Sequence, residues 1–359
     1  MPGPRFRAVM FGTLLFAGHP DLVRATTLPA AMQAIRYYEY GTSRVLQLVS
    51  VPRPAPGDHQ VLVEVRAAGV NPLDWHYMRG TPYLLRIDAG VRAPEDPKLG
   101  VDVAGTVVAV GAKVTRFKPG DDVFGTAPGA FAQYALATDT KLVPKPAEVS
   151  FEQAAAVPVA ALTALQGLRD KGRARPGQAV LINGASGGVG TFAVQIARAM
   201  GLRVTGVCSD RNVARVRALG AERVIDYARE DFTRDARRYD VVLDLVGNRG
   251  LLEVRRVMKP GGRYVLIGGG GPNDGRWIGP FGKALQGLVL DPFVDQEFTT
   301  LLAKIDASDL EYLAGLLRER KVVPVIDRRY PLARVPAAID YLERGHARGK
   351  VIIDVSVRD

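Results

Sequence analysis

A glycine-rich stretch, LINGASGGVG at residues 181–190, carries the clearest chemical signal in the sequence. Gly184 permits a tight turn directly after a strand, and Gly187 and Gly188 let backbone N–H groups approach a pyrophosphate without an intervening Cβ. Gly190 permits close packing of the helix that follows, whose N-terminus favours an anion. Ordinary loops also contain such spacings, but here an apolar strand precedes the motif and a helix follows it, as dinucleotide binding requires. The residues expected against the cofactor are Ser186, Gly187, Gly188 and Val189.

The residues after the next strand, RVTGV, indicate which dinucleotide fits. NAD sites place a carboxylate at the end of that strand to bind the ribose 2′-hydroxyl, whereas Cys208 stands there in this sequence. Ser209 and Arg211 follow, and a hydroxyl with a guanidinium suits a 2′-phosphate. We therefore expect NADPH. Two alternatives stay open: Arg211 could serve only to open the next helix, and Asp210 could still bind NAD.

Strands and helices alternate through the part of the chain that holds the glycine motif. After about residue 158 the segments QAVLIN, RVTGV, RVIDY, YDVVLDLVG and RYVLIGGG are typical of strands, with helical patterns between them. This alternation predicts an α/β fold with a parallel, doubly wound sheet over residues 158–320, which we expect to be the NADP-binding domain.

The preceding part of the chain has a different pattern. Segments such as VLVEVRAAGV, VAGTVVAVG and GAFAQYALA are short, rich in β-branched residues and separated by Pro and Gly, which predicts a β-rich domain over residues 32–157. We expect residues 321–357, with the strand KVIIDV, to complete that domain. Residues 1–31 contain the apolar AVMFGTLLFAG after two arginines, which could be the core of a signal peptide. An over-long start before Met32 is the favoured interpretation.

Composition excludes several classes of protein. The 359 residues are 47% hydrophobic and 24% charged, which is typical of globular proteins, and the length favours two domains. The net charge of +11 comes from Lys and Arg residues interleaved with Asp and Glu, so an anionic small ligand is favoured over nucleic acid. No apolar stretch reaches the roughly 18 residues that a membrane span requires. The single cysteine, Cys208, excludes an internal disulfide and a cysteine-rich zinc site, and it fits a cytoplasmic protein.

Several separate motifs, in one order, resemble the medium-chain dehydrogenase/reductase superfamily and within it the zinc-independent quinone oxidoreductase (ζ-crystallin-like) branch. They run from about Met32 to Val355 and are AAGVNPLDW, LGVDVAGTVVAVGAKVTRFKPGDDVFG, GAFAQYALA, ALTALQGL, NGASGGVG and GHARGKVIIDV. Mitochondrial reticulon-interacting and chloroplast-envelope homologues share this pattern. The resemblance implies a GroES-like catalytic domain, a Rossmann domain and a cofactor in the cleft between them.

The sequence departs from the zinc-dependent alcohol dehydrogenases of the same superfamily. Asn71 stands where those enzymes carry a metal-ligating cysteine, Val101 and Asp102 replace their His-Glu pair, and the cysteine-rich structural-zinc lobe is absent. Neither metal site can form from the usual ligands, so we expect no zinc. A quinone or an α,β-unsaturated carbonyl is then the suitable acceptor, because it delocalises charge onto a conjugated oxygen that a few hydrogen-bond donors can stabilise.

The resemblance also implies residues of the active site. Asn71 and Asp74 would lie beside the nicotinamide, and Tyr83 would project into the substrate space as a phenol donor. The alternatives are that Asn71 only begins a turn and that Tyr83 packs under the following loop. Phe131 is a candidate apolar wall of the substrate pocket, with core packing as its alternative. Further cofactor contacts are implied for Thr163, Tyr227, Val246, Gly268 and Gly269.

Two kinds of function stay open on this evidence. The first is hydride transfer from NADPH to a quinone or an enone, with an enoyl reductase acting on alkenals or acyl thioesters as the nearest alternative. The second is a protein that holds the cofactor and binds partners without turnover. We also expect a homodimer.

Overall fold

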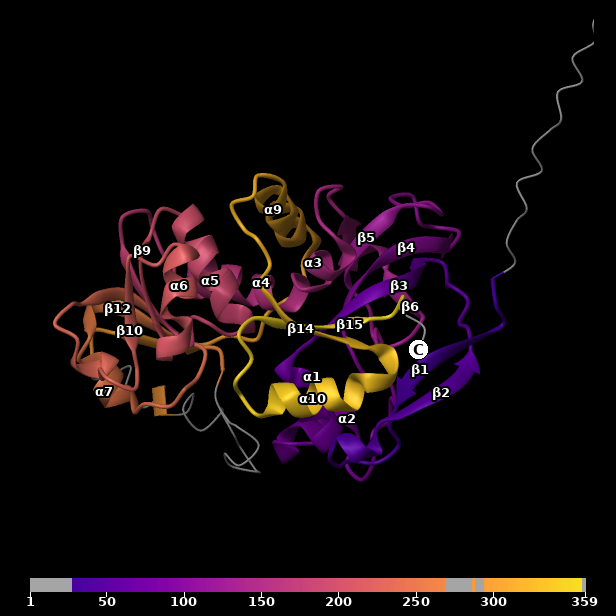
Figure 1. Ribbon diagram of the computed structural model, residues 1–359, viewed down its shortest axis with the longest axis horizontal. Coiled ribbons are helices and arrows are strands. Elements are labelled where there is room, and N and C mark those ends of the chain that lie inside the picture. Colours follow the sequence, from indigo (N-terminus) through magenta and orange to yellow (C-terminus); the bar gives the residue numbers. More distant parts are fainter. Residues whose placement is uncertain (1–27, 269–285, 288–293, 357–359) are drawn as a thin grey trace, which may run out of the picture.

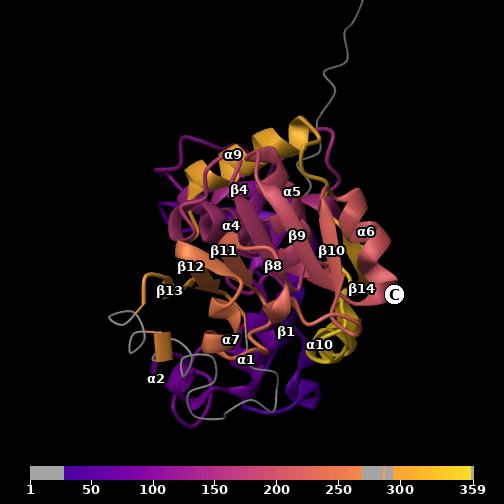
Figure 2. The same cartoon turned by 90° about the vertical axis from the view of Figure 1, so that its left-hand side faces the viewer.

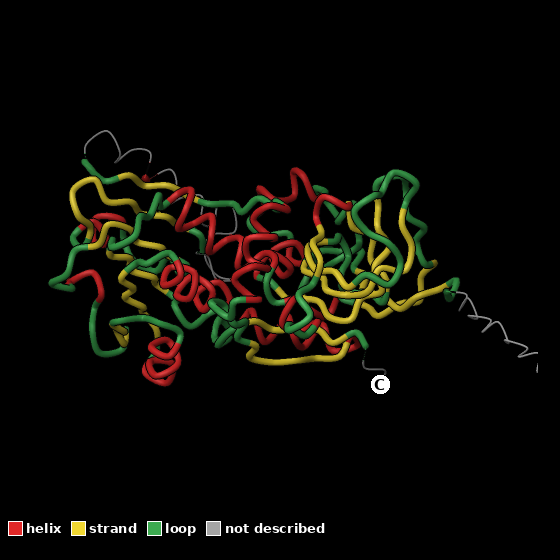
Figure 3. The backbone as a smooth tube through the Cα atoms, turned by 90° about the horizontal axis from the view of Figure 1, so that it is seen from above, coloured by secondary structure: helices red, strands yellow, loops and turns green. Residues whose placement is uncertain are grey.

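The structure is a computed structural model that describes residues 28–268, 286–287 and 294–356. Residues 1–27 of the predicted extension, and Gly269, lie outside the described residues. Two lobes lie side by side along the longest axis, each built on its own sheet (Figure 1). Seen from above, strands occupy both ends of the molecule and helices gather between them (Figure 3). The predicted α/β class, with a parallel sheet and a second, β-rich part, is confirmed.

Six parallel strands form the sheet of the lobe that holds the glycine motif. In spatial order they are β10 (Arg223–Asp226), β9 (Arg203–Cys208), β8 (Ala179–Asn183), β11 (Tyr239–Asp244), β12 (Met258–Leu266) and β13 (Glu297–Thr300), as Figure 2 shows. The chain order reverses between β8 and β11, which is the arrangement of a doubly wound fold. Ligands of such sheets bind beyond the carboxyl ends of the strands at this reversal. The ends of β8 and β11 therefore indicate where the site lies.

Helices cover this sheet because its strands are apolar on both faces. They are α4 (Pro158–Gln166), α5 (Gly188–Ala199), α6 (Val213–Ala218), α7 (Leu251–Arg255) and α9 (Ala307–Arg318). α5 packs against both the sheet and α4, and it is buried from Gly190 to Ala197. Its side chains Phe192 and Ile196 belong to the largest apolar cluster. This packing determines where the N-terminus of α5 lies.

The second lobe is a largely antiparallel sheet that takes strands from both ends of the chain. Its order is β14 (Ile326–Pro331), β15 (Lys350–Asp354), β3 (Gln60–Val70), β4 (Asp102–Val110), β5 (Asp122–Thr126) and β7 (Leu142–Pro144), with β6 (Tyr134–Thr138) also beside β3. β1 (Ala31–Arg36) and β2 (Gln47–Pro52) form a separate antiparallel pair. The pairing of β15 with β3 places Val351 opposite Val70, so the C-terminal strand lies beside the segment that holds Asn71.

Short helices complete this lobe. They are α1 (Pro72–Arg79), α2 (Arg86–Ala89), α3 (Phe151–Ala155) and α10 (Val335–Glu343). α1 follows β3 almost directly and packs against α10, with Trp75 and Met78 on its buried side. In the part of the chain that the structure describes, no helix is long and apolar enough to cross a membrane.

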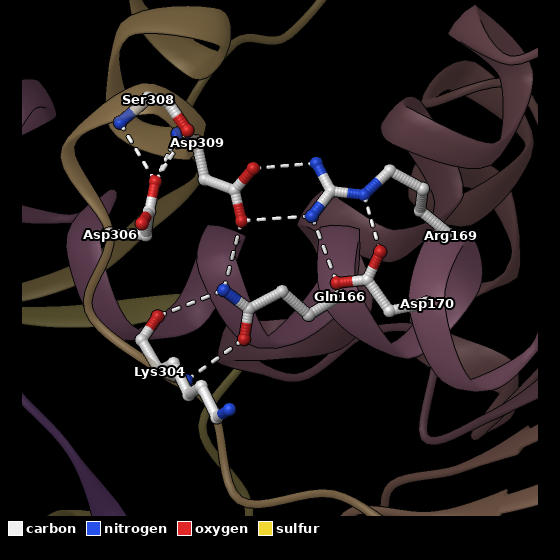
Figure 4. Close-up of polar contacts among 7 residues, drawn as sticks. All are labelled: Gln166, Arg169, Asp170, Lys304, Asp306, Ser308 and Asp309. Carbon is white, nitrogen blue, oxygen red and sulfur yellow. Dashed lines mark hydrogen bonds and ion pairs between the residues drawn. The ribbon is translucent and has the colours of Figure 1, made fainter.

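A polar cluster holds α9 against the end of α4 (Figure 4). Arg169, on a π-helical turn after α4, donates to both carboxylate oxygens of Asp309 at 2.5 and 3.0 Å and also pairs with Asp170. Gln166 donates to Asp309 at 2.9 Å and exchanges two hydrogen bonds with the backbone of Lys304. Because Gln166 and Asp309 are buried, these bonds fix α4 relative to α9.

Candidate cofactor and active site

The glycine motif forms the turn between β8 and α5. Gly184 has a φ of +87°, which disfavours any side chain, and no side chain caps the N-terminus of α5. A Cβ on Gly190 would lie 2.1 Å from the carbonyl oxygen of Gly184, so this close approach requires glycine. In contrast, a Cβ on Gly187 or Gly188 would meet no atom closer than 3.4 Å. The N-terminus of α5 is therefore a suitable cradle for a pyrophosphate.

A buried asparagine joins this turn to the end of β9. Nδ2 of Asn212 donates to Oγ of Ser186 at 3.2 Å and to Oγ of Ser209 at 3.0 Å. The structure thus brings together two serines that were both expected at the cofactor. Arg211 lies on the same short turn and is exposed, so a phosphate can reach its guanidinium. Asn212 was missed from the sequence, although its place four residues after the end of the second strand was a usable signal.

Two further residues expected at the cofactor, Tyr227 and Thr163, lie on other elements. Tyr227 follows β10; its backbone N–H donates to the carbonyl oxygen of Cys208 at 3.2 Å, and its ring is exposed. Thr163 lies within α4, where its hydroxyl donates to the carbonyl oxygen of Val159 at 2.6 Å. Their contacts with a cofactor stay predictions.

A buried aspartate shapes the loop after β11. Oδ1 of Asp244 accepts three hydrogen bonds. They come from Nδ2 of Asn183 at 2.8 Å and from the backbone N–H groups of Val246 and Gly247 at 3.1 and 2.8 Å. Oδ2 accepts the hydroxyl of Tyr264 at 2.7 Å, and burial raises the pKa of that phenol. Asp244 has no exposed surface. Sequence reasoning assigned no role to it, although an acid that closes an apolar strand was a signal.

Val246 and Gly268, both expected at the nicotinamide, come close together beside this aspartate. The backbone N–H of Gly268 donates to the carbonyl oxygen of Asp244 at 3.3 Å. A Cβ on Gly268 would lie 2.1 Å from the carbonyl oxygen of Leu245, so the two strand ends approach more closely than a side chain allows. Val246 is 41% exposed, which leaves its side chain accessible to a ligand.

In the β-rich lobe, three buried side chains form a closed ring of hydrogen bonds. Nζ of Lys350 donates to Oδ1 of Asn71 at 2.6 Å and lies 3.2 Å from Oδ2 of Asp102. Nδ2 of Asn71 donates to the same Oδ2 at 2.9 Å, which closes the ring. The relative exposures of Asn71, Asp102 and Lys350 are 4%, 0% and 3%. Sequence reasoning noted the motif GHARGKVIIDV but gave its lysine no role; a lysine that opens an apolar strand was the available signal.

This ring engages the oxygen and one N–H of the Asn71 amide. The second N–H of Nδ2 makes a long hydrogen bond to the carbonyl oxygen of Gly69, at 3.5 Å. The expected role of Asn71 as a donor stays a prediction, and it depends on that N–H.

Asp74 lies one helical turn from Asn71 and is buried with it. Its Oδ2 accepts the backbone N–H of Asn71 at 2.7 Å. Burial raises the pKa of Asp74 to about 7, and the carboxylate of Asp102 adds to this rise, whereas the hydrogen bond from Asn71 opposes it. A side chain with this pKa holds a proton in a substantial share of molecules at neutral pH.

Tyr83 and Phe131 have different surroundings. Tyr83 is half-buried, and the guanidinium of Arg86 lies 4.7 Å from its ring centroid and 4.4 Å from that of Tyr40. Phe131 is fully buried in the core of the β-rich lobe, where its ring would lie 2.8 Å from a Cβ on Gly100. This placement agrees with the core-packing alternative for Phe131. A role of either side chain toward a substrate stays a prediction.

The residues present do not fit the zinc sites of the alcohol dehydrogenases. Among the described residues, no group of three or more His, Cys, Asp and Glu side chains could hold a metal ion. Asp102, which stands in place of the His-Glu pair, is already paired with the ammonium of Lys350. An ammonium group donates only and cannot serve as a metal ligand.

Comparison with known proteins covers most of the chain. The family models of the alcohol dehydrogenase GroES-like domain and of the zinc-binding dehydrogenases match residues 57–147 and 219–353. A quinone oxidoreductase of Lama guanicoe is 37% identical over 339 residues, which cover 90% of this chain and 97% of that protein.

Two solved structures extend this likeness to the fold. The quinone oxidoreductase from Coxiella burnetii is 32% identical with a TM-score of 0.79, covering 90% of this chain and 99% of that chain. The Escherichia coli quinone oxidoreductase complexed with NADPH is 25% identical with a TM-score of 0.76, covering 90% of this chain and 100% of that chain.

Proposed function

We infer the reaction of this protein from the family to which it belongs, the quinone oxidoreductase branch of the medium-chain dehydrogenase/reductase superfamily. The protein is an oxidoreductase that depends on a nicotinamide cofactor. We propose that it transfers hydride from NADPH to a quinone or an α,β-unsaturated carbonyl, and that it does so without a metal. The observation that carries this proposal is the contact between the two halves of the site. Lys350, which bonds to Asn71, also lies near the pyrophosphate cradle, since its Cδ would be 3.4 Å from a Cβ on Gly188.

The preference for NADPH rests on the residues after β9. The strand ends in Cys208 rather than in a carboxylate, and Ser209 and Arg211 lie directly beyond it. Asn212 orients the hydroxyl of Ser209, which together with the exposed guanidinium suits a 2′-phosphate. Asp210 is also exposed, so NADH remains the competing cofactor for the same site.

The proposed class of acceptor rests on the side chains expected beside the nicotinamide. When bound, the cofactor supplies the hydride, and the residues of the chain orient the acceptor and stabilise the charge that develops on its oxygen. Candidate donors are the hydroxyl of Tyr83 and the second N–H of Asn71. Such donors suffice for a conjugated acceptor, whereas the localised alkoxide formed from an unactivated ketone needs stronger stabilisation, which a metal ion supplies in other enzymes.

A substrate panel tests this proposal. The purified protein is mixed with NADPH and, in turn, with quinones, alkenals, enones, an acyl thioester of an enoic acid, and a simple ketone, and the absorbance of NADPH is followed. Conjugated acceptors should oxidise NADPH and the simple ketone should not. If the protein binds NADPH but none of the acceptors leads to oxidation of NADPH, it is instead a cofactor-holding binding protein. Efficient reduction of the simple ketone would contradict the preference for conjugated acceptors.

We propose a cytoplasmic homodimer that acts on a small molecule and binds no nucleic acid. The single cysteine and the interleaved charges support the location and the class of ligand.

A further inference from the structure

Lys350 is an unusual residue for its place in the fold. It begins β15, whose next three residues, Val351 to Ile353, are fully buried apolar side chains. Among the described residues, its ammonium donates to three acceptors, which are Oδ1 of Asn71, Oδ2 of Asp102 and the carbonyl oxygen of Val70 at 3.1 Å. Taking a charge out of water is costly, and a stable core needs no lysine here. The presence of Lys350 here therefore points to a role beyond stability.

The ring fixes the orientation of the Asn71 amide. Lys350 can only donate and the Asp102 carboxylate can only accept, so Oδ1 must face the lysine and Nδ2 must face the aspartate. An amide between two neutral partners could rotate by half a turn without losing hydrogen bonds. Here such a rotation would bring two donors together and two acceptors together.

The ring also contacts both lobes. The second oxygen of Asp102, Oδ1, accepts the backbone N–H of Val159 at 2.9 Å, near the start of α4. The alkyl chain of Lys350 lies beside the pyrophosphate cradle, where its Cδ would be 3.4 Å from a Cβ on Gly188. Movement of Lys350 would therefore change both the direction of the Asn71 amide and the distance between α1 and the glycine turn.

We propose that Lys350 is a positioning residue for hydride transfer, which acts by fixing the Asn71 amide and the start of α1 relative to the cofactor cradle. This role rests on the proposed function. The competing interpretation is that the ring only stabilises the fold. The two interpretations differ when both charges are removed, because the large loss of stability arises when one member of a buried ion pair is removed and the other charge is left uncompensated. The neutral pair would still leave the Asn71 amide free to rotate.

The experiment compares Lys350→Met, Asp102→Asn and the double variant Lys350→Met/Asp102→Asn with the parent protein. Lys321→Met, at an exposed lysine, is the matched control. Three quantities are measured: the Tm of the cofactor-free protein, the Kd for NADPH from its fluorescence, and the stopped-flow rate of hydride transfer at saturating NADPH. If a single variant does not fold, the double variant provides the measurement.

Each single variant should have a lower Tm, because it leaves one buried charge without its partner. The double variant should recover most of the Tm and bind NADPH within about threefold of the parent, since the cradle itself is unchanged. Its hydride transfer should remain slower by up to about 10²-fold, which is the order expected for misplacement of reacting groups by about 1 Å. Lys321→Met should match the parent in all three measurements.

A double variant that recovers both Tm and hydride transfer would overturn the positioning role and leave only a structural one. An equally large loss of NADPH affinity would overturn it too, because Lys350 would then act on cofactor binding. A parent protein that reduces no acceptor contradicts the proposed function, and the positioning role with it. An active parent with an equally fast double variant contradicts the positioning role alone.

Discussion

The hydroxyl of Tyr264 donates a 2.7 Å hydrogen bond to Oδ2 of Asp244, between the carboxyl ends of two neighbouring strands. The other oxygen of this carboxylate holds the backbone of Val246 and Gly247. Since both residues of the pair are buried, each depends on the other as a hydrogen-bond partner. The pair therefore determines the shape of the loop expected at the nicotinamide end of the cofactor.

Tyr264→Phe should lower the free energy of unfolding by roughly 1–3 kcal/mol, because it leaves a buried carboxylate oxygen without its donor. It should also weaken NADPH binding, since the loop after β11 loses part of its support. Urea denaturation and fluorescence titration measure the two effects. Tyr312→Phe, at an exposed tyrosine of α9, is the control and should change neither. Unchanged NADPH affinity in Tyr264→Phe would mean that the loop does not contact the cofactor.

Arg211→Ala should weaken NADPH binding by roughly 1.5–3 kcal/mol, the usual contribution of a charge-assisted hydrogen bond, and leave NADH binding nearly unchanged. Isothermal titration with each cofactor checks this. The control is Arg217→Ala, at an exposed arginine of α6, and it should bind both cofactors like the parent. Equal losses for NADPH and NADH in Arg211→Ala would show that Arg211 only supports the fold.

Asn71→Ala should lower kcat and kcat/KM together, by up to about 10²-fold, because it removes a preorganised donor and opens the ring with Lys350. Tyr83→Phe keeps the ring that contacts Arg86 and removes only the hydroxyl. It should slow enone reduction more than quinone reduction, since a quinone delocalises charge further. Stopped-flow kinetics at saturating NADPH separate these effects from binding. If both variants turn over like the parent on both acceptors, the donors lie elsewhere.

The purified protein should contain no stoichiometric zinc, and chelators should leave its activity unchanged. The physical reason is the set of side chains: Asn71 and Val101 are not zinc ligands, and Lys350 already neutralises the carboxylate of Asp102. Metal analysis of the protein and assays after dialysis against a chelator provide the check. One tightly bound zinc ion per chain would refute this expectation.

Stability should decrease as the pH rises toward neutrality because of Asp74. Burial raises the pKa of Asp74 from 3.8 to about 7, so the folded protein binds this proton more tightly than the unfolded chain does. The resulting stabilisation is complete below pH 4 and is lost as the pH rises through 7. Two charged groups act on Asp74 in opposite directions: the carboxylate of Asp102 raises its pKa and the ammonium of Lys350 lowers it.

Asp74→Asn removes this titration. Its free energy of unfolding, measured in urea between pH 5 and pH 8, should therefore fall less steeply with pH than that of the parent. Asp88→Asn, at an exposed aspartate of α2, should follow the parent. Identical slopes for Asp74→Asn and the parent would mean that Asp74 is ionised across this range.

The amino-acid sequence was sufficient for the features that depend on short-range patterns. The alternation of apolar strands with helical segments predicted the doubly wound sheet, because such periodicity reports which faces of each element are buried. The glycine turn was predictable for the same local reason, since the φ of Gly184 and the contact of Gly190 with Gly184 involve residues within one turn of chain. The types of residue at positions 71, 101 and 102 by themselves made zinc binding unexpected.

Only the tertiary structure decided which buried polar groups meet. Lys350 and Asn71 are 279 positions apart in the chain, and they come together because β15 pairs with β3. In the same way, Asn212 joins Ser186 to Ser209, and Asp244 joins Asn183 to Tyr264, because neighbouring parallel strands end at one edge of the sheet. A buried donor needs a partner, but its own sequence neighbourhood does not specify that partner. The pairing of distant strands does, and it is this pairing that assigns Lys350 its place in the site.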